Sequence, residues 1–571
     1  MSEPYILDWT RQLGTTANDI ANSVAIDSNN NVYITGYTVG SLDGSNAGSF
    51  DAFLAKYDST GTKVWTRQLG STGADYAYSV AIDSNNNVYI TGSTRGSLDG
   101  SNAGSHDAFL AKYDSTGTKV WTRQLGSTGA DYARGVAIDS NNNVYITGYT
   151  LGSLVGSNAG SDDAFLAKYD STGIRVWTKQ LGTSSSDVAR GVAIDSNNNV
   201  YITGYTAGGL DGTNAGAYDA FLAKYDSTGT KVWTRQFGTS SVDLPSGVAI
   251  DSNNNVYITG YTVGSLDGSN AGSFDAFLAK YDSTGTKLWT KQLGTSGAED
   301  SLGVAIDSNN NVYITGSTGG NLDGTNAGLD DAFLAKYDST GTRVWTKQLG
   351  STASDQALGV AIDSNNNVYI TGSTFGSLAG SNAGLDDAFL AKYLAPPPPP
   401  PPVPICFPKG TPVTTNQGIV AIEKLNTDIH TIRGKKIVAI TQSRPIHKYI
   451  MSIETDALGK NVPSAPIQIS KEHKVFYNGK MVKANELVEV CEGVTRIPYS
   501  GETLYNVLME KHDNMMINNV ICETLDPKNI MAKICGGKYN RLEQDNICKE
   551  LNDIIKSDNI PAYKKLYASL K

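Results

Sequence analysis

The stretch VAIDSNNNVYITGYT (residues 24–38), followed after a connecting segment by DAFLAKYDSTGTKVWTRQLG (residues 51–70), decides the fold of this 571-residue chain. Its short runs of β-branched and aromatic residues are bounded by turn residues, which is typical of β-strands. We predict strands in VAID, NVYITGYT, DAFLAKYD and TKVWTRQLG. Asp, Asn and Gly tolerate the left-handed conformation, so DSNNN and DSTGT favour tight hairpins between these strands. The unit is therefore expected to be a four-stranded antiparallel sheet.

This unit recurs with a period of 56 residues up to Tyr393. The period is marked by all the tryptophans of the chain: Trp9, Trp65, Trp121, Trp177, Trp233, Trp289 and Trp345. The chain begins with a fourth strand, YILDWTRQLG, and the array ends after a third strand. Pairing the first strand with the last three would leave no free sheet edge. We therefore predict an all-β fold with a seven-bladed β-propeller closed by the N-terminal strand.

DSNNNVYITGYT and DAFLAKYDSTGTKVW resemble the seven-bladed β-propeller repeat family found in cell-surface and secreted proteins. The resemblance covers about 390 residues and implies a fold and a tendency toward surface display or binding, with no shared chemistry.

Two positions of the repeat differ from copy to copy, whereas the hairpins hardly change. The first follows GYT or GST and holds Val39, Arg95, Leu151, Ala207, Val263, Gly319 and Phe375. The second precedes DAF and holds Phe50, His106, Asp162, Tyr218, Phe274, Asp330 and Asp386. We expect these loops on one face of the disc, where they would bind a protein or glycan ligand. The alternative interpretation is drift in solvated loops after duplication.

Composition limits the other functions. The net charge is −10, and residues 406–571 hold 23 basic and 18 acidic residues, so the propeller is strongly acidic and is not expected to bind nucleic acid. One histidine and no cysteine in the propeller, with Asp162, Asp330 and Asp386 unmarked as a pair, argue against a glycosidase. DSNNN could offer oxygen ligands to Ca²⁺ but is more simply a turn. We find no cofactor or metal motif.

The sequence also bears on cellular location. All five cysteines follow residue 405, and their odd number and irregular spacing suit neither a disulfide framework nor a zinc site, so we expect synthesis in a reducing cytoplasm. The start shows no signal peptide, and no run of 18 apolar residues predicts a transmembrane span.

A proline run separates the repeats from a different kind of sequence. We divide the chain into a propeller (1–394), a polyproline II linker (395–405), a β-rich domain (406–534) and a helical tail (535–571). The β-rich domain opens with CFPKGTPVTTNQGIVAIEKL, which suggests a hairpin around Gly410 and Gly418. We predict a second strand pair turning at Asn478-Gly479, and two strands around a turn at residues 512–514. A leading cysteine and a distant histidine can form a nucleophile and its acid or base.

Three blocks of this domain resemble a Hint domain, the self-processing module of Hedgehog proteins and inteins. They are CFPKGTPVTTNQGIVAIEKL (406–425), ISKEHKVFYNGKMVKANEL (469–487) and LYNVLMEKHDNMMINN (504–519), and the later blocks are similar to Hint proteins of large mimivirus-like DNA viruses. That similarity would suit a virion or surface location. The resemblance implies self-cleavage at Ile405-Cys406, with Cys406 as nucleophile.

The same resemblance assigns the other site residues. It gives His473 the role of acid, Ser470 that of its orienting partner, and His512 that of the late-block histidine. Glu523-Thr524 stands where splicing needs His-Asn, so the resemblance implies an autocatalytic cleavage whose thioester is resolved by water, a thiol or another nucleophile. The alternative is a structural or adhesion protein with an inactive Hint domain.

Overall fold

The computed structural model describes residues 5–396, 407–443, 449–471, 473–499, 504–509 and 514–523. The chain divides into two compact units, Met1–Pro396 and Pro397–Lys571, which are described separately.

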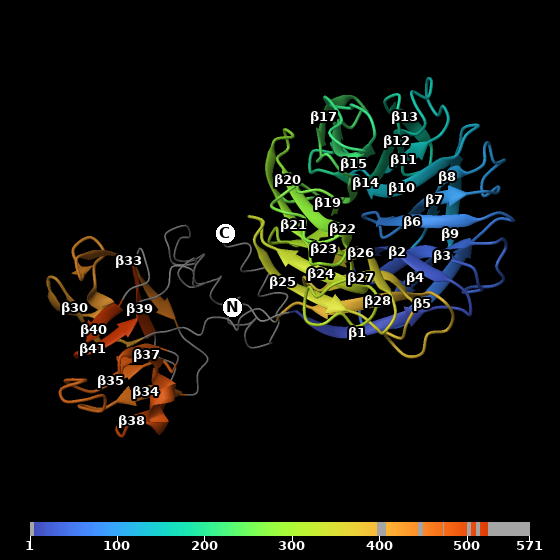
Figure 1. Cartoon of the computed structure of the whole chain (residues 1–571). Coiled ribbons are helices and arrows are strands. Elements are labelled where there is room, and N and C mark those ends of the chain that lie inside the picture. The colour runs from blue at the N-terminus through green and yellow to red at the C-terminus, as the bar shows by residue number, and fades with distance from the viewer. Residues whose placement is uncertain are drawn as a thin grey trace. The chain divides into compact units, whose positions relative to one another are not determined.

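The first unit consists of four-stranded antiparallel sheets that follow one another around a ring (Figure 1). Blade 1 contains β2 to β5, each later blade contains the next four strands, and blade 7 contains β26 to β28 together with β1. The first strand of each blade lies innermost and packs on the first strands of its neighbours. The innermost strands are β2 (Asp19–Ile26), β6 (Asp75–Ile82), β10 (Asp131–Ile138), β14 (Asp187–Ile194), β18 (Asp243–Ile250), β22 (Glu299–Ile306) and β26 (Asp355–Ile362).

The other strands of the blades follow outward in sequence order. The second strands are β3 (Val32–Thr38), β7 (Val88–Thr94), β11 (Val144–Thr150), β15 (Val200–Thr206), β19 (Val256–Thr262), β23 (Val312–Thr318) and β27 (Val368–Thr374). The third strands are β4 (Asp51–Tyr57), β8 (Asp107–Tyr113), β12 (Asp163–Tyr169), β16 (Asp219–Tyr225), β20 (Asp275–Tyr281), β24 (Asp331–Tyr337) and β28 (Asp387–Leu394). The outermost strands are β1 (Ile6–Leu13), β5 (Lys63–Leu69), β9 (Lys119–Leu125), β13 (Arg175–Leu181), β17 (Lys231–Phe237), β21 (Lys287–Leu293) and β25 (Arg343–Leu349).

The ring closes as the sequence predicts. β1 pairs antiparallel with β28, and Figure 1 shows the blue β1 beside the yellow β28. The bonds that join other blades also join blade 7 to blade 1: Ser364 donates to Asn30 Oδ1 at 3.0 Å, and Lys392 Nζ donates to the carbonyl of Ser59 at 2.9 Å. The N-terminal strand thus removes the free edge of the last blade.

The two hairpins form for the expected reasons. Asn30 and its equivalents have φ of 61° to 63°, and the carboxylate of Asp27 accepts the backbone N–H groups of Asn29 and Asn31. Gly61 has φ of 81°, and a Cβ there would lie 2.8 Å from the Trp9 ring, so this position also needs glycine for space. The pairing of Asp19 with Thr38, and of Thr38 with Asp51, puts both hairpins on one face and the variable loops on the other.

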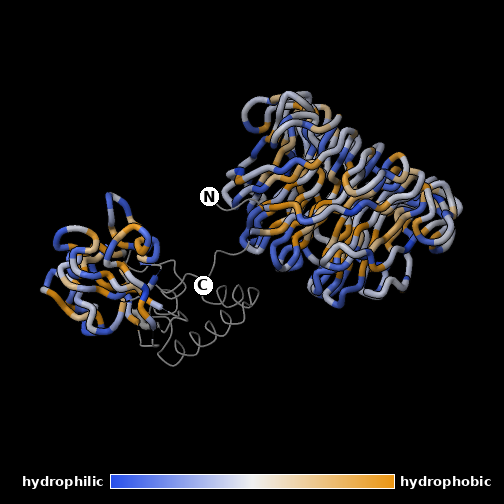
Figure 2. The backbone as a smooth tube through the Cα atoms, turned by 90° about the horizontal axis from the view of Figure 1, so that it is seen from below, coloured by the Kyte–Doolittle hydropathy of each residue, from blue (hydrophilic) through white to orange (hydrophobic). Residues whose placement is uncertain are grey.

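The core of each blade is apolar and repetitive. Tyr33 and Phe53, like their equivalents, are fully buried between neighbouring sheets. Trp65 packs edge-on against Tyr33, with the ring centroids 5.9 Å apart. In the propeller, hydrophobic residues follow the strands and hydrophilic residues gather in the connecting loops (Figure 2).

The second unit is also β-rich, with two short 3₁₀ turns, η1 (Ile422–Lys424) and η2 (Ala484–Glu489). Its sheets have the orders β29-β39-β33-β32, β30-β31, β35-β34-β38 and β37-β36-β41-β40. The strands are β29 (Phe407–Pro408), β30 (Pro412–Thr415), β31 (Gly418–Ala421), β32 (Thr431–Ile432), β33 (Lys435–Ser443), β34 (Tyr449–Ile453), β35 (Ile467–Ile469), β36 (Lys474–Tyr477), β37 (Lys480–Lys483), β38 (Val494–Pro498), β39 (Leu504–Met509), β40 (Asn514–Ile517) and β41 (Val520–Glu523).

Two of the three strand pairs expected here are present. β30 and β31 form the first hairpin, and β36 and β37 turn at Asn478-Gly479, where both residues have positive φ. Strands also lie on both sides of the third expected turn, but they do not pair with each other, because β39 pairs with β29 and β33, whereas β40 pairs with β41. The hairpin turn lies at Asn518-Asn519, with φ of 45° and 68°, since two asparagines accept the left-handed conformation. No helix in the described parts of the chain is long and apolar enough to cross a membrane.

Candidate functional site

The predicted site residues divide into two groups. Ile405, Cys406 and His512 lie outside the described residues, as do the rest of the linker after Pro396 and the tail 535–571. Ser470 and His473 are described, and both are fully buried in the second unit.

The structure brings the start of the second unit to His473. Phe407, the residue that directly follows Cys406, is fully buried, and its ring centroid lies 4.1 Å from that of His473. Consecutive Cα atoms are about 3.8 Å apart. Cys406 is therefore bonded to a residue in ring-to-ring contact with the predicted acid.

The short strand β29 fixes Phe407 in this place. Phe407 pairs with Tyr505 and Pro408 with Leu504, both in β39. The turn after β29 is held by Thr411, whose hydroxyl donates to the carbonyl of Pro408 at 2.7 Å. These contacts tie the residues after Cys406 to the centre of the unit.

Glu423 supports the same turn from the IEKL segment. Its Oε2 accepts the backbone N–H of Gly410 at 2.8 Å, and this hydrogen bond lowers the pKa of Glu423 below its ordinary value. Hydrogen bonds therefore hold the turn after β29 and join it to the IEKL segment, which belongs to the same first block.

His473 is held through its backbone at a tight turn. Its N–H donates to the carbonyl of Ser470 at 3.1 Å, and its own carbonyl accepts the N–H of Ala484 at 2.8 Å, where η2 begins. The three-residue spacing of Ser470 and His473 thus makes a turn in which both side chains are buried, with His473 against Phe407.

Sequence reasoning did not identify Phe407. The available signal was its place immediately after the proposed nucleophile, followed by a proline and a glycine turn. An aromatic residue at that point anchors the first strand of the domain in the core.

The variable positions of the propeller lie where the sequence predicts, on the face opposite the hairpins. Arg95 donates to Nε2 of His106 at 2.7 Å, and burial followed by the charge of Arg95 lowers the pKa of His106, so this histidine is neutral. The three aspartates at the second variable position lie in different blades: Asp162 in blade 3, Asp330 in blade 6 and Asp386 in blade 7. Asp162 accepts a hydrogen bond from Ser186 at 2.8 Å, whereas Asp386 is buried.

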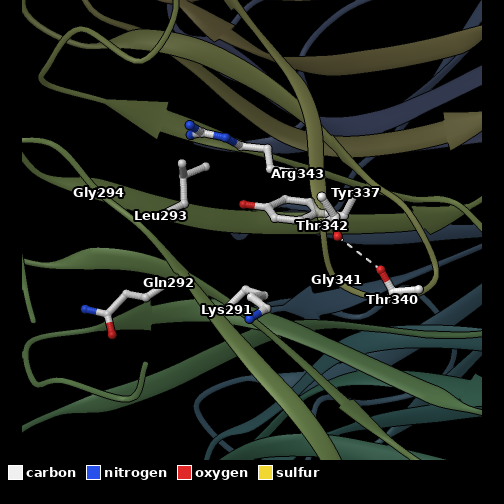
Figure 3. Close-up of a pocket in the computed structure, with 9 residues that line it drawn as sticks. All are labelled: Lys291, Gln292, Leu293, Gly294, Tyr337, Thr340, Gly341, Thr342 and Arg343. Carbon is white, nitrogen blue, oxygen red and sulfur yellow. Dashed lines mark hydrogen bonds between the residues drawn. The ribbon is translucent and has the colours of Figure 1, made fainter. Parts of the chain in front are cut away.

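A pocket of about 450 Å³ lies between blades 5 and 6, from β21 to the turn joining β24 and β25 (Figure 3). Thr340 and Thr342, whose hydroxyls are 3.1 Å apart, form one wall. Its lining residues belong to the repeated set. Equivalents occur at every other junction except that of blades 6 and 7, with Lys and Arg exchanged, Ile174 in place of Thr342 and Phe237 in place of Leu293. The pocket is therefore part of the scaffold and is not a singular site.

Comparison with protein families identifies both units. A β-propeller repeat family matches seven times, at residues 8–43, 64–99, 120–154, 176–211, 232–267, 288–323 and 344–378, and a Hint domain family matches residues 405–529. The chain is a seven-bladed β-propeller joined to a Hint domain. The Hint match begins at Ile405, one residue before the proposed nucleophile.

Curated relatives of this propeller–Hint protein are distant. An uncharacterized WD repeat-containing protein, L264, of Acanthamoeba polyphaga mimivirus is 25% identical over 495 residues, covering 64% of this chain. The regulatory protein FlaEY of Caulobacter vibrioides is 26% identical over 352 residues, covering 53% of this chain. The chain spans 36% of the length of each relative. The mimivirus relative agrees with the resemblance stated from the sequence.

Among solved structures, the propeller–Hint chain is similar to a polysaccharide lyase of family PL25, an ulvan lyase, with 11% identity, a TM-score of 0.39, and coverage of 68% of this chain and 96% of that one. It is also similar to the Pan2 WD40 domain of Neurospora crassa, with 10% identity, a TM-score of 0.37, and coverage of 67% and 95%.

Proposed function

We propose that the chain is a precursor in which the Hint domain cuts the Ile405-Cys406 peptide bond and releases the propeller as a binding module. The contact between Phe407 and His473, 4.1 Å between ring centroids, carries this proposal because it joins the residue after Cys406 to the proposed acid. The Hint match over residues 405–529 supports it.

The first step exchanges an amide for a thioester. The Cys406 thiolate attacks the carbonyl carbon of Ile405, and the C–N bond then breaks as the nitrogen leaves. An amide nitrogen leaves only when it is protonated, so His473 donates a proton to it, which frees the amino group of Cys406. Ser470, at the other end of the same turn, orients the histidine. A positioned acid of this kind contributes about 10²- to 10⁴-fold.

The second step releases the propeller. Water attacks the thioester carbonyl, the C–S bond breaks, and the sulfur leaves as thiolate, giving a carboxylate at Ile405 and an N-terminal Cys406. A small thiol can replace water, in which case the first product carries a new thioester. The products are residues 1–405, with the proline run as a tail, and residues 406–571.

The released propeller would bind a protein or glycan ligand through the face that carries the variable positions. Support comes from the contrast between the two faces, since the hairpins opposite are nearly uniform. The variable positions are where this face offers side chains that differ from blade to blade.

Intact-mass measurement of the expressed full chain tests the cleavage. We expect fragments of residues 1–405 and 406–571, faster appearance with dithiothreitol, no fragments from Cys406→Ala, and about 10²-fold slower cleavage of His473→Ala. Cys548→Ala and His430→Ala are the matched controls, because His430 is partly exposed and bonds Asn426 in a surface loop. A single intact mass after incubation with the thiol would overturn the proposal and favour a structural protein.

A further inference from the structure

Several side chains that break the symmetry of the propeller lie on the innermost strands or next to them. We define the axial cluster as the residues at the repeat positions of Ile20, Asn22, Tyr37 and Phe50 in every blade. The first two positions lie on the innermost strand, and Tyr37 is the register partner of Ile20. All four lie toward the face of the variable loops. In Figure 1, β2, β6, β10, β14, β22 and β26 surround the middle of the disc.

Blades 1 to 5 supply aromatic rings to the axial cluster. Tyr37 of blade 1 lies 5.0 Å from Tyr76 of blade 2, and Tyr132 of blade 3 lies 4.8 Å from both His106 and Tyr149. Blades 4 and 5 add the pairs Tyr205–Tyr218 and Tyr261–Phe274, with centroids 5.1 and 5.0 Å apart, and we call the rings of these five blades the aromatic arc. None of them repeats around the full ring, in contrast to the buried Tyr33 and Phe53 positions.

Two arginines lie on this arc without a carboxylate partner. The guanidinium of Arg134 stacks on Tyr78 at 4.1 Å and donates to the Tyr149 hydroxyl at 3.5 Å, and Arg190 lies 5.2 Å from the Tyr205 ring. Within residues 5–396 neither makes an ion pair, whereas Arg67, Arg123 and Arg235 on the outer strands all do. A guanidinium with free donors is a ready site for a bidentate carboxylate.

Blades 6 and 7 supply carboxylates instead of rings. Asp300 accepts both the N–H and the hydroxyl of Ser317, at 2.8 and 2.7 Å, on one of its two oxygens. Asp386 is only 7% exposed, and its Oδ1 is buried with no hydrogen-bond partner. A buried acceptor without a donor costs free energy unless a ligand supplies one.

The arginines and the carboxylates of the axial cluster act on the same tyrosines. The charges that act on the Tyr37 hydroxyl include Arg134 of blade 3 and Asp386 of blade 7, and those that act on Tyr261 include Arg190 of blade 4 and Asp300 of blade 6. Each of these two tyrosines therefore lies within electrostatic range of an arginine from blades on one side of it and of an aspartate from the blade on its other side. Apart from Asp162 of blade 3, the carboxylates of the cluster come from blades 6 and 7, whereas its arginines and aromatic rings come from blades 1 to 5.

We propose that the axial cluster binds an oligosaccharide that contains uronic acid. The uronate carboxylate would lie on Arg134, sugar rings would stack on the tyrosine faces, and sugar hydroxyls would donate to Asp300 and Asp386. This inference rests on the proposed role of the propeller as a binding module and names its site and ligand class.

The composition of the cluster favours a sugar over a peptide. Interfaces with proteins centre on a dry apolar patch surrounded by a polar rim, whereas here charged and hydroxyl groups stand among the rings. A sugar offers many O–H donors and a C–H face, which match carboxylate acceptors and the negative faces of aromatic rings. A peptide is therefore included in the test as the competing ligand.

Calorimetric titration of the full-length Cys406→Ala chain with tetragalacturonic acid tests the proposal. We expect binding that weakens with added salt, and roughly 10- to 100-fold weaker binding by Arg134→Gln, the range for a lost charge-assisted hydrogen bond. Cellotetraose, the neutral probe, should bind much more weakly. Arg123→Gln is the matched control, because Arg123 lies on an outermost strand and pairs with Asp99.

Four results would overturn the inference: no binding of the acidic tetrasaccharide, equal binding of the neutral one, unchanged binding by Arg134→Gln, or preferred binding of a glutamate-rich peptide. Tryptophan fluorescence checks that Arg134→Gln is folded, since every tryptophan lies in the propeller. Intact mass of the wild-type chain reports cleavage separately, so failure of the sugar site and failure of self-cleavage are distinguished.

Discussion

Replacing Asp386 by asparagine is expected to stabilise the propeller at neutral pH. Burial, and then the charge of Asp387, raise the pKa of Asp386 from 3.8 to about 6, and Tyr37 is a further titratable group in its electrostatic range. The folded protein therefore holds this proton up to about pH 6, whereas the unfolded chain loses it near pH 3.8. Stability falls as pH rises between these values, and the loss is complete above pH 6.

The size of the effect follows from the shift. About two pH units at 1.36 kcal/mol per unit give about 3 kcal/mol at pH 7.5. With about 2.1 cal/mol/K per residue, the Met1–Pro396 unit unfolds with an entropy of about 0.8 kcal/mol/K, so Asp386→Asn should raise Tm by about 4 °C. Below pH 3.8 wild type and variant should melt together.

The assay is thermal unfolding followed by tryptophan fluorescence, which reports the propeller alone because the Hint domain has no tryptophan. Asp162→Asn is the matched control: it occupies the same repeat position, but Ser186 already donates to its carboxylate, so a change of less than about 1 kcal/mol is expected. If Asp386→Asn lowers Tm at pH 7.5, or raises it equally at pH 3.5 and 7.5, the reasoning fails.

Three further outcomes are expected. Tyr5→Phe removes a 2.7 Å hydrogen bond to Tyr313 beside the closing strand and should lower the free energy of unfolding by about 1 kcal/mol, measured by urea denaturation; no change would contradict a closing role for that bond. Gly117→Ala strains φ of 86° and places Cβ 2.9 Å from the Trp65 ring, so it should cost about 1–3 kcal/mol in the same assay, whereas Gly100→Ala, with φ of 83° and open space, should cost less. Phe407→Ala should slow appearance of the 406–571 fragment in intact-mass measurements and leave tryptophan-detected melting unchanged, while Phe407→Leu should retain more cleavage; equal rates would remove the positioning role of the ring.

The propeller was predictable because the residues that define its strands and turns are close together in sequence and recur in every blade. Each hairpin carries its own left-handed residue, and the count of strands forces β1 to close the ring. The axial cluster was missed, although the signal was present. Comparing the seven copies at the Ile20, Asn22 and Tyr37 positions would have found Tyr78 and Arg134, but only the ring geometry shows that these positions from different blades meet.

The Hint domain was harder because its pairing is not local. β39 follows β38 in sequence but lies between β29 and β33, and nothing in the turn before β40 encodes that choice. The spacing of Ser470 and His473 did give their turn. Their approach to the start of the domain depends on Phe407, whose contact spans more than sixty residues of sequence and follows from packing, not from any local pattern.

Symmetry explains why a propeller of near-identical blades gains most from singular residues placed near its axis. A ligand bound at the rim of a blade meets one or two repeats, so seven identical copies give seven equivalent sites. A ligand on the axis meets all the blades at once, and identical residues there would present one chemical group from every direction. Tyr78, Arg134 and Asp386 make the axial positions unequal, with hydrogen-bond donors from blades 2 and 3 and an acceptor from blade 7. The hairpins and outer strands keep the bonds that hold the blades together.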